Sequence, residues 1–125
     1  MAKIMIIAGD IMIRAQLYDT PTARAIEQIL PVQGTVSTWG DEIYFTIPLE
    51  QMLEPDARQD VEAGELGYWP QGPTFCIFFG PTPASTSGNP RAYSPVNVFG
   101  RVLEDPKSLK GVQNDELIRV DIYSG

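Results

Sequence analysis

The sequence predicts a mainly β protein of one domain, built as a closed or nearly closed antiparallel barrel. Three observations support this prediction. Short segments in which apolar and polar residues alternate recur along the 125 residues, which is typical of half-buried strands. Glycine and proline, 11 of each, separate these segments and mark turns. Only one stretch has the spacing of an amphipathic helix. Closure of the sheet is expected because it removes strand edges that would otherwise pair with other chains.

The first predicted element is a hairpin. Residues 3–7 and 11–18 flank a turn at Gly9 and Asp10, and the second segment alternates with a period of two. One face of that segment is the better core face because all of its residues are apolar: Ile11, Ile13, Ala15 and Leu17.

One main helix and two short helical turns are predicted. Pro21 suits the start of a helix, residues 23–30 place apolar side chains on one helical face, and Pro31 ends the helix. Short helical turns are expected at residues 57–61 and 105–111. Glycine and proline turns separate the other predicted strands, which are residues 35–39, 42–47, 64–69, 74–79, 96–102 and 117–123.

Composition limits the possible partners and the location of the protein. The formal charge is -7, and no basic stripe is present, so binding to nucleic acid or to an anionic membrane surface is not expected. The single cysteine, Cys76, excludes an intramolecular disulfide and suits a reducing compartment. The apolar run at residues 4–8 is too short for a membrane helix and poor as a signal peptide, so we expect a cytoplasmic protein.

The chain contains no histidine. This removes the commonest metal ligand and the usual general base near neutral pH, and it excludes nucleophiles of the Ser-His and Cys-His types. We therefore expect no metal, no cofactor and no catalytic residues. Asp41, Glu42 and Glu65 could in principle act as acid and base, but carboxylates in a hairpin are most often solvated turn residues.

The stretch from Gly64 to Pro83 places aromatic residues beside two proline-rich turns. Such turns hold strand ends rigid, so aromatic walls there would form a preorganised groove, whereas packing in the core or at its rim is the alternative explanation. Glu42 could accept a hydrogen bond at the rim or be a plain surface carboxylate. Tyr93, in the flexible-looking loop 84–95, could close over the groove unless that loop is disordered. The candidate ligand-binding residues are Glu42, Tyr44, Trp69, Phe78, Thr82 and Tyr93.

Several segments, taken in order, resemble cyclophilins. Residues 17–30 look like the strand and first helix of that fold, residues 64–66 like its Gly-x-Leu segment, and residues 96–102 like its His-Val-Val-Phe-Gly-Lys/Arg-Val strand. The resemblance implies a closed eight-stranded antiparallel barrel with helices at its ends, and residues 1–125 as one domain. A small prokaryotic cyclophilin-like family of unknown function is similar in three longer segments, here residues 39–45, 64–70 and 78–83.

The resemblance does not extend to the cyclophilin active site. Cyclophilins use an arginine in a Phe-His-Arg strand to polarise the prolyl nitrogen, whereas residues 39–47 contain no arginine, and Val96 stands where the family has a pocket histidine. We therefore expect a barrel that binds a small molecule or short peptide without isomerase chemistry. Two alternatives stay open: a peptidyl-prolyl isomerase with a displaced arginine, and a module for protein interaction or self-assembly. A guanidinium in the groove would favour the first, and a broad apolar surface elsewhere would favour the second.

Overall fold

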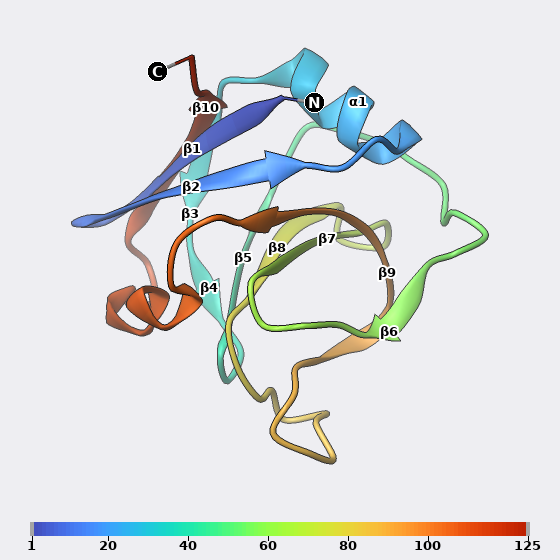
Figure 1. Cartoon of the computed structure of the whole chain (residues 1–125), viewed down its shortest axis with the longest axis vertical. Helices are drawn as coiled ribbons and strands as arrows, with labels where there is room; N and C mark the ends of the chain where they lie inside the picture. Colours follow the sequence, from blue (N-terminus) through green and yellow to red (C-terminus); the bar gives the residue numbers. More distant parts are fainter. Residues whose placement is uncertain (1, 125) are drawn as a thin grey trace.

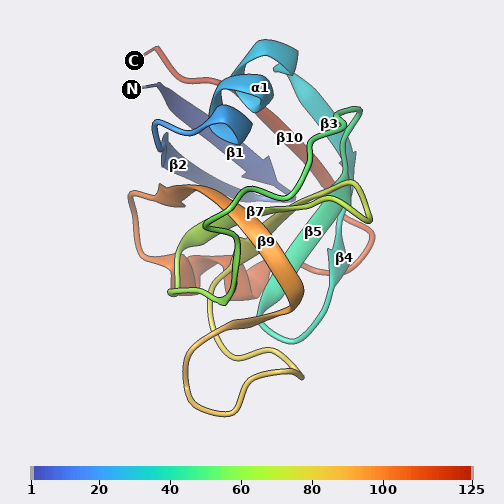
Figure 2. The same ribbon diagram turned by 90° about the vertical axis from the view of Figure 1, so that its right-hand side faces the viewer.

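Ten strands form an antiparallel sheet that wraps around the main hydrophobic core (Figure 1). The computed structural model describes residues 2–124. The elements are β1 (Lys3–Ala8), β2 (Ile11–Leu17), α1 (Pro21–Ile29), β3 (Val32–Thr35), β4 (Ser37–Thr38), β5 (Glu42–Thr46), β6 (Arg58–Asp60), β7 (Glu65–Trp69), β8 (Thr74–Phe78), β9 (Arg91–Val102), the 3-10 helix η1 (Pro106–Gly111) and β10 (Leu117–Ile122). Their order in the sheet is β3-β10-β1-β2-β9-β7-β8-β5-β4, with β6 paired to β9. Helix α1 lies at one end, and the loop before β9 projects at the other (Figures 1 and 2).

The sheet is not closed, so the prediction of a closed eight-stranded barrel is wrong. The two end strands, β3 and β4, belong to one stretch of chain that changes partner at Val36: β3 pairs with β10, and β4 pairs with β5. Consecutive segments of one extended chain cannot pair with each other, so no ladder of hydrogen bonds joins the two ends of the sheet. The two strands that the sequence prediction missed, β3 and β6, bring the number from eight to ten.

The predicted hairpin and main helix are confirmed. Strands β1 and β2 pair from Lys3 opposite Gln16 to Ala8 opposite Ile11, and Ile13, Ala15 and Leu17 are buried in the core. Helix α1 is capped by Thr20, whose Oγ1 accepts a hydrogen bond from the Ala23 amide at 3.1 Å. No helix among residues 2–124 is long and apolar enough to cross a membrane.

One of the two predicted short helical turns is present. Asp105 caps η1 by accepting a hydrogen bond from the Lys107 amide at 3.0 Å. The prediction of a helical turn at residues 57–61 is wrong, because the central three of these residues form strand β6 (Arg58–Asp60), which pairs with β9. Pairing with a strand distant in the sequence outweighs the local preference of so short a segment.

Strands β5, β7 and β8 separate two apolar clusters. On β8, Phe75 and Ile77 point into the main core, whereas Cys76 and Phe78 point to the opposite face of the sheet. There they join a smaller apolar group, which we call the outer cluster. Its buried members are Val61, Cys76, Phe78, Ala92 and Val96, and Tyr44, Trp69 and Val98 pack against it.

Candidate functional site

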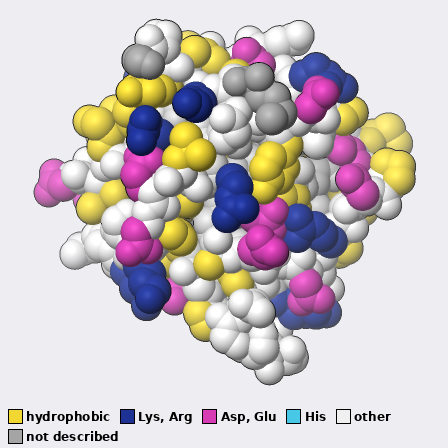
Figure 3. All heavy atoms as spheres, viewed as in Figure 1, with side chains coloured by type: hydrophobic (Ala, Val, Ile, Leu, Met, Phe, Trp, Pro, Cys, Tyr) yellow, Lys and Arg dark blue, Asp and Glu magenta, His cyan; other side chains and the backbone are white. Residues whose placement is uncertain are grey.

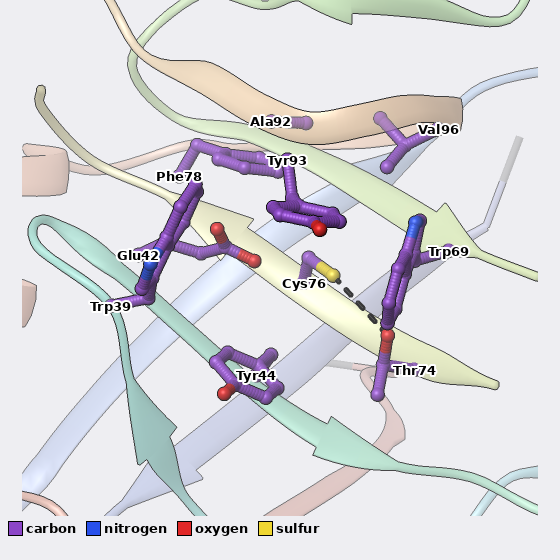
Figure 4. Close-up of a pocket in the computed structure, with 10 residues that line it drawn as sticks. All are labelled: Trp39, Glu42, Tyr44, Trp69, Thr74, Cys76, Phe78, Ala92, Tyr93 and Val96. Atoms are coloured by element: carbon purple, nitrogen blue, oxygen red, sulfur yellow. Dashed lines mark hydrogen bonds between the residues drawn. The ribbon is translucent and has the colours of Figure 1, made fainter. Parts of the chain in front are cut away.

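A cavity of about 340 Å³ lies over the outer cluster (Figure 4). Aromatic side chains form most of its walls, and among residues 2–124 the only Asp, Glu, Lys or Arg that lines it is Glu42. The lining residues come from β5, β7, β8, β9 and the turn before β5: Trp39, Glu42, Tyr44, Trp69, Thr74, Cys76, Phe78, Ala92, Tyr93 and Val96.

Strand alternation places the floor of the cavity. On β5, the two neighbours of Tyr44 enter the main core, so Glu42 and Tyr44 point to the outer face. The register of β5 with β8 then sets Glu42 opposite Phe78 and Tyr44 opposite Cys76. Because both faces of these strands are used, the same two strands build the core and the site.

Three aromatic rings form an open box. The Trp39 and Tyr93 rings lie 6.1 Å apart between centroids at 74°, and the Trp69 and Tyr93 rings lie 6.0 Å apart at 86°. Both indoles therefore stand nearly perpendicular to the Tyr93 ring, one at each end of it, and Tyr44 lies on the side opposite Tyr93 (Figure 4). The orientation of the Trp69 indole is fixed because its Nε1 donates a hydrogen bond to Ser94 Oγ at 2.6 Å.

A tight turn positions Trp39 and Glu42 in the lining of the cavity. The Trp39 amide donates to the Glu42 carbonyl at 2.9 Å, and the Glu42 amide donates back to the Trp39 carbonyl at 3.2 Å. Gly40 adopts a φ of 59°, and a Cβ added to it would lie 3.0 Å from the Pro81 carbonyl oxygen. The Asp41 amide donates to that same oxygen at 2.9 Å. The turn thus packs against the proline-rich segment after β8, and the close contact at Gly40 leaves no room for a side chain there.

Tyr93 lies in β9, and its backbone is held by a side chain of β6, although 72% of the residue is exposed. Only the first part of the predicted loop 84–95 is a loop, because β9 begins at Arg91. Gln59 Nε2 donates hydrogen bonds to the carbonyl oxygens of Ala92, at 3.0 Å, and Tyr93, at 3.2 Å. The missed strand β6 therefore supports the aromatic residue that covers the cavity.

Glu42 is buried, with 6% of it exposed, so its interpretation as a solvated turn residue is wrong. No lysine or arginine among residues 2–124 forms an ion pair with it. Burial raises the pKa of Glu42 to about 7, and contact with the Cys76 thiol offsets only part of this increase. A carboxyl group with this pKa holds its proton about half of the time near neutral pH, so it can donate or accept a hydrogen bond.

Cys76 forms the floor of the cavity beside Glu42 (Figure 4). Burial, and then the neighbouring Glu42 charge, raise the pKa of the Cys76 thiol well above its ordinary value. Its Sγ lies 3.6 Å from the Thr74 hydroxyl oxygen. A thiol in this environment is a poor nucleophile. In the part of the chain that the structure describes, no group of three or more His, Cys, Asp or Glu residues is placed to hold a metal ion.

We expect Cys76 to react slowly with a thiol probe in the native protein and rapidly after unfolding. Only 3% of the residue is exposed, and burial disfavours the thiolate that must attack the reagent. Labelling followed by absorbance, with and without denaturant, measures both rates. Rapid labelling of the native protein would mean that the outer face of β8 opens to solvent.

Five of the six candidate ligand-binding residues surround this one cavity, and their role in binding stays a prediction. Thr82 lies outside it: its hydroxyl donates to the Arg91 carbonyl oxygen and accepts from the Ala84 amide, which ties the loop after β8 to the start of β9. Trp39 lines the cavity but was not among the candidates. Its position directly before the Gly-Asp turn is the sequence feature that could have indicated its place in the cavity lining. The five candidates at the cavity are Glu42, Tyr44, Trp69, Phe78 and Tyr93.

Comparisons with known proteins agree with this fold. The profile of the family described as Cyclophilin-like matches residues 2–121, whereas no curated protein matches the chain. The solution structure of the hypothetical protein AF2241 from Archaeoglobus fulgidus is 35% identical, with a TM-score of 0.81 over 98% of this chain and 95% of that one. McbB, solved in complex with tryptophan, is 17% identical with a TM-score of 0.71, and shares the fold over 98% of this chain and 45% of McbB. Because the family profile spans nearly the whole sequence, the chain belongs to the Cyclophilin-like family.

Proposed function

We propose that the protein binds a small molecule or short peptide in the cavity of Figure 4, without isomerase chemistry of the cyclophilin type. One observation carries this proposal: Glu42 is a buried carboxyl group with no ion-pair partner among residues 2–124, and aromatic rings surround it. Burying an ionisable group costs free energy, which an apolar side chain would avoid at a purely structural position. A carboxyl group with a strongly perturbed pKa in a cavity is typical of a functional site.

The positions of the arginines favour binding over isomerisation. In the described part of the chain, residues 2–124, no arginine lines the cavity. Arg58 makes two hydrogen bonds with the Glu65 carboxylate, at 2.9 and 3.0 Å, and Arg14 pairs with Glu104 at 3.3 Å. Arg101 is exposed and does not line the cavity. No guanidinium is therefore available at the cavity to polarise a prolyl nitrogen.

We expect no acceleration of prolyl isomerisation at concentrations where a cyclophilin gives full exchange. The cavity lacks the arginine that stabilises the twisted peptide bond. A protease-free NMR exchange assay on a prolyl peptide measures this, with a cyclophilin as the positive control. Robust catalysis that Arg101→Ala or Arg14→Ala abolishes would instead establish an isomerase with a displaced arginine.

Self-assembly through an apolar face has less support. Large apolar side chains are exposed on the outer face of β1 and β2, but charged residues interrupt them: Ile7 lies between Met12 and Arg119 in the sheet, and Met5 lies between Arg14 and Asp121. The face seen in Figure 3 likewise has hydrophobic side chains interspersed with acidic and basic ones. A stable interface between copies would need a broader apolar surface.

Native mass spectrometry of the purified protein tests the proposal by detecting small molecules that stay bound. Compounds found in this way are titrated by calorimetry together with aromatic amines, aromatic acids and short peptides. Tryptophan is included because it is the ligand in the McbB structure. The cytoplasmic location and the absence of nucleic-acid and membrane partners stay predictions.

Tyr93→Ala should weaken binding by about tenfold or more, because it removes one wall of the box. The exposure of Tyr93 keeps the stability cost of this change small. Tyr123→Ala is the matched control, since Tyr123 lies outside the cavity and packs against Arg14, with the guanidinium 5.6 Å from the ring centroid. A ligand that Tyr93→Ala leaves unaffected, or the absence of any ligand, would contradict the proposal.

A further inference from the structure

We propose that the ligand carries an organic cation, an ammonium group that sits inside the aromatic box and against the Glu42 carboxylate. This inference rests on the proposed function and names the chemical class of its ligand. Such a ligand requires a site that offers aromatic faces and a negative charge and that contains no lysine or arginine to compete for that charge.

The box has the geometry that an ammonium group requires. A cation is attracted to the face of an aromatic ring when it lies within about 6 Å of the ring centroid, most strongly for tryptophan. Trp39 and Trp69 stand at 74° and 86° to the Tyr93 ring, with centroid distances of 6.1 and 6.0 Å. A group held between these rings can therefore approach more than one of them. Tyr44 adds a fourth ring on the remaining side (Figure 4).

The charge of the lining favours a cation over an anion or a neutral group. Glu42 is the only charged residue among the lining residues, and it has no ion-pair partner among residues 2–124. The protein as a whole has a formal charge of -7, which attracts cations toward its surface. An anionic ligand would meet no lysine, arginine or histidine in the lining.

A cationic ligand would also supply the opposite charge that Glu42 lacks among residues 2–124. Desolvation opposes ionisation of Glu42, and burial raises its pKa to about 7. An ammonium group beside the carboxylate favours the ionised form, so binding at acidic pH releases the Glu42 proton to solvent. Affinity for a permanent cation should then rise with pH up to about 7 and level off above it.

The other titratable groups around Glu42 do not replace it in this role. From the turn, Asp41 is not among the lining residues and pairs with Lys110 at 3.9 Å. From β8, Cys76 has a pKa raised well above its ordinary value, so it remains neutral in the relevant range. From β5 and β9, Tyr44 and Tyr93 contribute aromatic rings to the lining. Arg91, also on β9, is occupied: it donates to Asp60 at 2.8 Å and to Gln59 at 3.1 Å.

Binding of a neutral ligand would have the opposite pH dependence to binding of a cation. If Glu42 recognised a carbonyl group, it would do so in its protonated form, as a donor. Binding would then be strongest at acidic pH and would weaken as the carboxyl ionises above about 7. The sign of the pH dependence therefore separates a cationic ligand from a carbonyl ligand.

The test uses choline and benzyltrimethylammonium, each with an uncharged isostere in which carbon replaces nitrogen. Calorimetric or NMR titrations of the intact protein are made at about pH 8 and about pH 5, with the wild type and Glu42→Gln. Because the protonated form must lose its proton, we expect the cations to bind about 100-fold more weakly at the lower pH. The isosteres should bind weakly at both pH values. Glu42→Gln should remove the pH dependence and reduce affinity for the cations at about pH 8. Glu27→Gln is the matched control, since it removes one exposed carboxylate on α1 and should change neither property.

Four results would overturn the inference. These are equal binding of cation and isostere, stronger binding at acidic pH, cation binding that Glu42→Gln leaves unchanged, and no cation binding. In each case, another ligand that depends on Tyr93 would leave the proposed function standing. Both proposals fail if none of these compounds, and none found by native mass spectrometry, shows binding that Tyr93→Ala weakens.

Discussion

Glu42→Gln should raise the free energy of unfolding at about pH 8 by about 3 kcal/mol, and by much less at about pH 4. In the folded protein the pKa of Glu42 is raised from 4.5 to about 7 by burial. Between these two values the folded state keeps the proton and the unfolded chain loses it. Stability therefore falls as the pH rises through this range, and the loss is complete above about pH 7. Glutamine has a similar shape and stays neutral, so this loss disappears.

Urea unfolding of the wild type and of Glu42→Gln at several pH values measures this difference. Glu27→Gln again serves as the control, because Glu27 is exposed on α1 and its change should stay within about 0.5 kcal/mol at every pH. If the wild type and Glu42→Gln lost stability in parallel as the pH rises, Glu42 would have an ordinary pKa and would be solvated.

Trp69→Ala should weaken ligand binding by about 30-fold. Truncating a fully buried aromatic residue typically lowers the free energy of unfolding by about 3 to 5 kcal/mol, and we expect a smaller loss here. Trp69 is only partly buried, and its indole is one wall of the aromatic box. Rigid aromatic anchors often dominate recognition, so the loss should appear mainly in affinity.

Trp69→Phe is the reference variant, because it keeps an aromatic wall but loses the hydrogen bond to Ser94. We expect it to bind with intermediate affinity. Denaturant unfolding and titration with the ligand found by native mass spectrometry are made on the same preparations. A large loss of stability together with unchanged affinity would assign Trp69 to the core and leave the cavity without a binding role.

The elements that depend on local patterns could be predicted from the sequence. The alternation of apolar and polar residues predicts the hairpin of β1 and β2, and the proline at the start of α1 together with its apolar face predicts that helix. Strands β3 and β6 were missed because they are short and owe their form to partners distant in the sequence, β10 and β9. Closure of the sheet depends on how its two ends meet, which alternation within a strand does not determine.

The same limit applies to the site. The outward direction of Glu42 and Tyr44 follows from alternation on β5, and the aromatic residues near the proline turns were identified as wall residues. The burial of Glu42 was not predictable, because it depends on Phe78 and Cys76 of β8 and on Tyr93 of β9. For the same reason, the place of Trp39 in the cavity lining was missed.

The separation of the two faces of β5 and β8 also affects how this protein could change over evolutionary time. Exchanging an outward side chain, such as Glu42, Tyr44 or Cys76, leaves the inward residues that specify the fold in place. New ligand preferences could therefore arise by single substitutions on a scaffold that tolerates them. Among proteins that share this architecture, the chemistry of the outward positions should diverge faster than the pattern of the inward ones.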